Sequence, residues 1–134
     1  MTTYVDSSAL LKRYVNEPDS DIANQLLATD PVLVTSWITM VEVRRNLALL
    51  LRGKALDAAR RLFQTDLDAV ALVSVDQTTC HLAVGIAEDL GVRSLDALHL
   101  ASAQRLLIAA MPFVTFDRRQ ARAARLLGFT VLGA

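Results

Sequence analysis

The fold is indicated first by residues 3–14, TYVDSSALLKRY. A short run of strand-forming residues ends at Asp6, and the serines after it are typical caps for a helix that carries Leu10 and Leu11. This pattern predicts a strand followed at once by a helix, with an acidic residue at the junction. A chain that repeats such a unit is expected to form parallel strands joined by helices.

The same alternation continues through the rest of the chain. Further strands are expected at 31–35, 70–75, 113–115 and 130–132. Helical patterns lie between the strands. One begins at Pro18, two more are expected at 40–52 and 55–67, and the last three run from Asp76 to Gly91, from Ser94 to Leu106 and from Asp117 to Gly128. The strands are nearly continuous apolar runs, as in a sheet covered on both faces. The sequence therefore predicts an α/β fold, a three-layer α/β/α sandwich with a central parallel β-sheet, as a single domain over residues 1–134.

Composition narrows the functional class. The chain is 53% hydrophobic with a formal net charge of +0, so it is not expected to coat nucleic acid through bulk positive charge. A local arginine patch can still hold phosphates. No apolar stretch is long enough to span a bilayer, and the N-terminus lacks the pattern of a secretory signal peptide. Cys80 is the only cysteine, which fits a reducing, cytoplasmic location.

Four acidic residues are expected to meet at one edge of the sheet. Asp6 and Asp117 follow strands, while Glu42 and Asp96 lie in the first turns of helices that should begin at the same edge. Ligands of open parallel sheets bind beyond the carboxyl ends of the strands. Packed carboxylates repel one another, and a divalent cation such as Mg²⁺ or Mn²⁺ relieves that repulsion. Because a bound cation lowers the pKa of water, such a site supports hydrolysis of phosphodiester bonds.

Each acid also has a purely structural interpretation. Asp6 and Asp117 can end strands and cap helices, and Asp96 is favourably placed at the positive end of a helix. Glu42 can complete a capping box with Thr39. The two interpretations are compatible, because a catalytic acid can also stabilise its own helix. The joint pattern of four acids favours a site.

Four short motifs contain these acids: VDSSALLK at 5–12, VEVRR at 41–45, LDALHLASA at 95–103 and TFD at 115–117. Their order and spacing resemble those of the PIN-domain ribonucleases over essentially the whole chain. A free-standing domain of this size is similar to the VapC-type toxins of bacterial type II toxin–antitoxin systems. The resemblance implies a PIN-like, Rossmann-like fold.

The resemblance also implies a function and partners. It implies a magnesium-dependent endoribonuclease, with Mn²⁺ as a substitute, that hydrolyses RNA, is inhibited by a cognate VapB-like antitoxin and forms a homodimer without a membrane attachment. It gives Asp6 and Asp96 as the principal metal ligands. Glu42 and Asp117 complete the catalytic metal site, directly or through water.

Further residues around the acids receive supporting roles. By the same resemblance, Thr115 and Ser7 orient a carboxylate or a water. His99 lies one turn beyond Asp96 on the same helix face. An acid-only site does not require this histidine as a general base.

Arg118 and Arg119 are candidates to contact RNA phosphates, because they directly follow the fourth acid. A solvated helix face with local ion pairs is the alternative.

Three other functions match parts of the pattern. A hydrolase with an aspartyl nucleophile and a phospho-receiver domain both require a lysine near a late strand, whereas Lys54 is the last lysine of this chain. The remaining alternative is a catalytically silent PIN-like module that binds RNA or protein. The complete set of acids favours the enzyme.

Overall fold

The structure, a computed structural model, describes residues 1–134. Its elements follow in the order β1 (Thr2–Val5), α1 (Ser7–Leu11), α2 (Ser20–Leu27), β2 (Val32–Ser36), α3 (Ile38–Leu50), α4 (Gly53–Ala69), β3 (Ala71–Val73), α5 (Gln77–Leu90), α6 (Ser94–Gln104), β4 (Pro112–Thr115), α7 (Arg118–Leu126) and β5 (Thr130–Gly133). The expected alternation of strands and helices is confirmed. None of the helices has the length and apolar character needed to cross a membrane.

The five strands form one parallel sheet in the order β3-β2-β1-β4-β5. Strand β1 is central, because Thr3 pairs with Leu33 of β2 on one side and Tyr4 pairs with Phe113 of β4 on the other. The chain first builds the sheet outward from β1 to β2 and β3, and then returns to place β4 on the opposite side of β1. Strand order therefore reverses between β1 and β4, which is where ligands bind in open parallel sheets.

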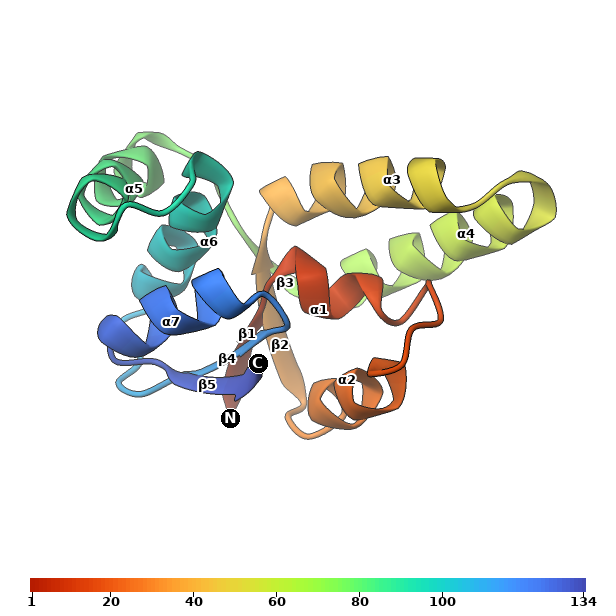
Figure 1. The fold of residues 1–134 in the computed structure, drawn as a ribbon, viewed down its shortest axis with the longest axis horizontal. Coiled ribbons are helices and arrows are strands. Elements are labelled where there is room, and N and C mark those ends of the chain that lie inside the picture. The colour runs from red at the N-terminus through yellow and green to blue at the C-terminus, as the bar shows by residue number, and fades with distance from the viewer.

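Alternate residues of the central strands enter two separate hydrophobic cores. Tyr4 and Phe113 belong to the core under α5, α6 and α7, and their rings stack with centroids 5.0 Å apart. Val5 and Val114 belong to the core under α1, α2, α3 and α4. Figure 1 shows these two groups of helices on opposite sides of the sheet. The expected three-layer sandwich is thus confirmed.

Candidate active site

Asp6 lies directly after β1 and is only 4% exposed. Its Oδ1 accepts hydrogen bonds from the Ala9 backbone N–H at 3.2 Å and from the Ser8 hydroxyl at 2.6 Å. Its Oδ2 accepts a bond from the Thr115 hydroxyl at 2.5 Å. Asp6 is therefore the N-cap of α1, and the expectation that Ser7 or Ser8 caps this helix was wrong. Three donors hold a buried carboxylate in one orientation.

Thr115 connects the ends of β1 and β4. It is fully buried, and besides donating to Asp6 its hydroxyl oxygen accepts a bond from the Asp117 backbone N–H at 3.1 Å. The Ser8 hydroxyl accepts a bond from the Phe116 N–H at 3.0 Å. These bonds fix the position of the Asp6 carboxylate relative to both strands that flank the reversal of strand order.

Glu42 lies in the second turn of α3, facing α1. Its Oε1 accepts a hydrogen bond from the Ser7 hydroxyl at 3.0 Å and lies 2.6 Å from His99 Nε2. Ser7 therefore contacts a carboxylate, as the sequence motif suggested.

The capping box expected for α3 is absent. The helix begins at Ile38, two residues earlier than expected, and its N-cap residue Trp37 makes no side-chain capping bond. Thr39 is fully buried, with its hydroxyl 2.7 Å from that of Thr35. The interpretation of Glu42 as a capping residue was wrong, because Thr39 lies inside the helix and bonds to the sheet.

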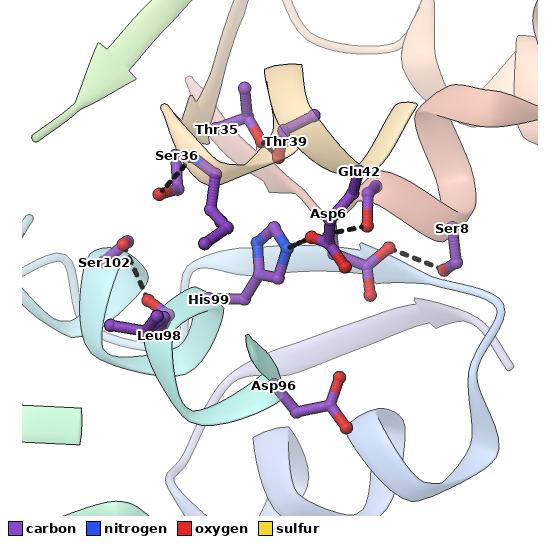
Figure 2. A network of polar contacts seen from close by, with 12 residues as sticks. Asp6, Ser8, Thr35, Ser36, Thr39, Glu42, Asp96, Leu98, His99 and Ser102 are labelled. Carbon is purple, nitrogen blue, oxygen red and sulfur yellow. Dashed lines mark hydrogen bonds and ion pairs between the residues drawn. The ribbon is translucent and has the colours of Figure 1, made fainter. Parts of the chain in front are cut away.

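His99 is held at both ring nitrogens. Its Nδ1 lies 2.8 Å from the Tyr4 hydroxyl, while Nε2 faces Glu42, and both His99 and Tyr4 are buried. Since a carboxylate only accepts, Nε2 carries a hydrogen toward Glu42, while Nδ1 is hydrogen-bonded to the Tyr4 hydroxyl. Figure 2 shows the imidazole directed at Glu42 and away from Asp96. This arrangement makes His99 a positioning residue for Glu42.

The two acids nearest His99 have opposite pKa shifts. Burial raises the pKa of Asp6 above its usual value, although the charge of His99 and the bonds from Ser8 and Thr115 act against this rise. Burial alone would also raise the pKa of Glu42, but the hydrogen bond and charge of His99, together with Ser7, bring it below its usual value. Glu42 thus carries its negative charge more readily than Asp6 does.

Asp96 and Asp117 form a more open part of the site. Asp96 is the third residue of α6 and is half-buried, and its carboxylate accepts no hydrogen bond, whereas its backbone carbonyl accepts one from Gln120. Burial raises the pKa of Asp96, and the negative charges of Asp117 and Asp6 raise it further. Asp117 is exposed and caps α7 by accepting bonds from the N–H groups of Arg119 and Gln120. The structural interpretation of Asp117 as an N-cap is therefore confirmed.

The four acids approach one another without forming a closed coordination cluster. No group of three or more acidic, histidine or cysteine side chains lies close enough to hold a metal ion directly. The donor chemistry nevertheless fits a hard divalent cation, because the carboxylate of Asp96 and Oε2 of Glu42 have no hydrogen-bond partner. Burial raises the pKa of Asp6, and burial together with the charges of Asp117 and Asp6 raises the pKa of Asp96, so a bound cation would offset the cost of ionising both. Mg²⁺ keeps several water ligands when it binds to proteins. A few carboxylates can therefore hold it, with water molecules filling the remaining coordination positions.

Sequence reasoning missed some of the contacts around these acids. The hydrogen bond between Tyr4 and His99 was missed. Strand periodicity could have indicated it, because Tyr4 lies two residues before Asp6 and therefore on the same face of the strand. Ser8 was expected only as a possible helix cap, whereas its hydroxyl donates to Asp6. Arg118 and Arg119 lie at the start of α7, and both are exposed.

Comparison with known proteins agrees with this geometry. Residues 3–126 match the family model described as the PIN domain. The chain is 40% identical over 129 residues to Ribonuclease VapC46 of Mycobacterium tuberculosis, covering 96% of this chain and 95% of that protein.

Two solved structures share the fold. FitAcB from Neisseria gonorrhoeae has a TM-score of 0.75 at 22% identity, covering 98% of this chain and 96% of that chain. A toxin–antitoxin complex from Klebsiella pneumoniae has a TM-score of 0.67 at 17% identity, covering 86% of both chains. The family model and the 40% identical relative each span nearly the whole chain. The chain therefore belongs to the PIN-domain family.

Proposed function

We propose that this chain is a divalent-metal-dependent endoribonuclease and the toxin of a VapBC-type toxin–antitoxin pair. The observation that carries the proposal is Asp6, a buried carboxylate held by three donors at the reversal of strand order, with Glu42 and Asp96 on adjoining helices. The identity to Ribonuclease VapC46 supports RNA as the substrate. The expected cofactor is Mg²⁺, with Mn²⁺ as a substitute. The expected partners are a VapB-like antitoxin and a second copy of the chain, in the cytoplasm.

The chain's own residues prepare the site before any ion binds. Asp6 and Asp96 would hold the ion as principal ligands, Glu42 would complete the site, and Asp117 would act through water. Ser8 and Thr115 orient the Asp6 carboxylate, and their hydrogen bonds to it take the place of water on the buried side of this carboxylate.

His99 and Ser7 both bond to Oε1 of Glu42, which leaves Oε2 free to face a ligand. When bound, the cation activates a water molecule and neutralises charge on the phosphate during hydrolysis. The protein contributes fixed ligands whose orientation needs no rearrangement.

The activity is tested with purified protein and end-labelled RNA. We expect the wild-type protein to cleave RNA in Mg²⁺ and EDTA to abolish this cleavage. Asp6→Asn should not cleave RNA, because the asparagine amide is a poor cation ligand. Asp57→Asn, an exposed acid on α4, is the matched control and should cleave as the wild type does. RNA binding without cleavage, with Mg²⁺ and with Mn²⁺, would instead support the silent module.

The toxin role is tested in cells. Induction of the chain alone should arrest growth, and co-expression of the small protein encoded beside it should restore growth. Induction of Asp6→Asn should not arrest growth. Arrest by this variant at equal expression would separate toxicity from RNA cleavage and contradict the proposal.

A further inference from the structure

A cavity of about 520 Å³ adjoins Asp96. Its wall combines the end of α5, the loop that starts α6 and one face of α7. Three guanidinium side chains from two of these segments line it: Arg93, Arg119 and Arg122. Asp96 lines the same cavity, so the cavity and the candidate active site share a residue.

The three arginines lack acidic partners. The ion pairs of the structure include Arg13 with Asp66 and Arg105 with Asp76, but none of them involves Arg93, Arg119 or Arg122. These three side chains are exposed toward solvent.

Two carboxylates also border the cavity, those of Asp89 and Asp96, and neither lies within ion-pair distance of an arginine. Three positive charges thus face two negative ones, and Asp96 is assigned above to the cation. The cavity is left with an excess of positive charge.

The start of α6 adds to this positive character. Its N-cap residue is Arg93, in extended conformation and without a side-chain capping bond, and Ser94, where the sequence predicted the helix to begin, is its first residue. The first N–H groups of a helix lack intrahelical partners and carry the positive end of the helix dipole.

We propose that this cavity binds a backbone phosphate of the RNA substrate next to the phosphodiester that is cleaved, held by Arg93, Arg119 and Arg122. The inference rests on the proposed ribonuclease function. An RNA chain whose scissile phosphate lies at Asp96 carries its neighbouring phosphate one nucleotide away, beside the cavity. Guanidinium groups bind phosphate oxygens in a bidentate fashion, which suits this role. Of the two arginines expected from sequence to contact RNA, Arg119 lines the cavity and Arg118 does not.

Binding is measured apart from cleavage. Fluorescence anisotropy of a labelled single-stranded RNA is recorded over a range of salt concentrations in the Asp6→Asn background, which prevents hydrolysis. Adding Arg93→Ala, Arg119→Ala or Arg122→Ala should each weaken binding about tenfold, the effect of losing a hydrogen bond to a charged group. Each loss of a phosphate contact should also reduce the slope of log K against log salt by about 0.7 for single strands.

The matched control is Arg61→Ala, which removes one exposed arginine from α4, outside the cavity. It should leave affinity and slope unchanged. In the active background the three cavity variants should raise KM more than they lower kcat. Thermal unfolding of every variant should match that of its parent, because the substituted side chains are exposed.

The outcomes separate the two proposals. Wild-type protein that neither binds nor cleaves RNA overturns the ribonuclease function. Wild-type protein that cleaves RNA, with cavity variants that bind as Arg61→Ala does, overturns the phosphate site alone. Cavity variants that lose affinity for the antitoxin but not for RNA would show an acidic protein segment as the occupant and would also overturn it.

Discussion

The two halves of the candidate site are built differently. Asp6 and Glu42 accept hydrogen bonds from side chains of other elements, and Asp6 is almost fully buried. Asp96 and Asp117 lie on the first turn and the cap of their helices, more exposed, and Asp96 accepts no side-chain hydrogen bond. The first pair is a preorganised half, and the second pair is an open half.

This difference assigns separate tasks to the halves. The preorganised half fixes carboxylate positions, so changes there should alter both stability and activity. The open half keeps oxygens available for a ligand, and changes there should mainly alter activity. The predictions below test this division, beginning with the largest expected effect.

Asp96→Asn should reduce cleavage by about a thousandfold or more, because it would remove one of the two proposed principal cation ligands. Its effect on stability should depend on pH. The folded pKa of Asp96 is raised, so the protonated carboxyl resembles asparagine in acid, and ionisation destabilises the wild type as pH rises through the folded pKa. Without metal, the variant should therefore unfold at a higher temperature than the wild type at neutral pH, and the difference should vanish in acid.

Thermal unfolding with and without Mg²⁺ checks this prediction. The cation should stabilise the wild type and leave Asp96→Asn unchanged, because only the wild type offers the charged ligand. A constant difference between the two proteins at all pH values would show that the charge of Asp96 does not cause the effect.

Thr115→Val should reduce cleavage by about 10- to 100-fold, since a donor that orients a metal-binding carboxylate contributes this much to metal affinity or activity. It removes the hydroxyl that donates to Asp6 and accepts from the Asp117 N–H. Leaving these buried groups without their partner should cost about 1–3 kcal/mol in the free energy of unfolding. Thr115→Ser keeps the hydroxyl and serves as the control, and equal losses in both variants would point to packing as the cause.

Tyr4→Phe should weaken Mg²⁺ binding by less than about tenfold, because it acts on Glu42 only through His99. Denaturant unfolding should show a loss of about 1 kcal/mol for the missing hydrogen bond. Tyr14→Phe removes a comparable bond to Asp66 on α4 and should lower stability without changing Mg²⁺ affinity. Equal Mg²⁺ affinities for both variants would contradict the positioning role of His99.

Asp117 should give the smallest effects. Asp117→Asn keeps a capping oxygen for the N–H groups of α7 and should change stability little, whereas Asp117→Ala should lose about 1 kcal/mol. Cleavage should fall only a few-fold in Asp117→Asn if this acid acts through water. A loss as large as that of Asp96→Asn would place Asp117 among the direct ligands.

Local patterns were sufficient to predict the fold. Apolar runs, helix caps and Gly91 at the end of α5 are read from a few neighbouring residues, and they predicted the alternation of strands and helices. Helix starts were less accurate, because Asp6 rather than a nearby serine occupies the cap of α1. Several residue types can cap a helix, and tertiary contacts decide which one does.

The sequence by itself determined the parallel sheet, the placement of the four acids near its carboxyl edge and the family, since these follow from local periodicity and short motifs. Only the tertiary structure decided which donors serve each acid. Glu42 meets His99 across 57 residues and Asp6 meets Thr115 across 109, and Arg93 joins Arg119 and Arg122 around one cavity. Such contacts depend on strand register and on how helices dock onto the sheet, and neither property is encoded in the spacing of neighbouring residues.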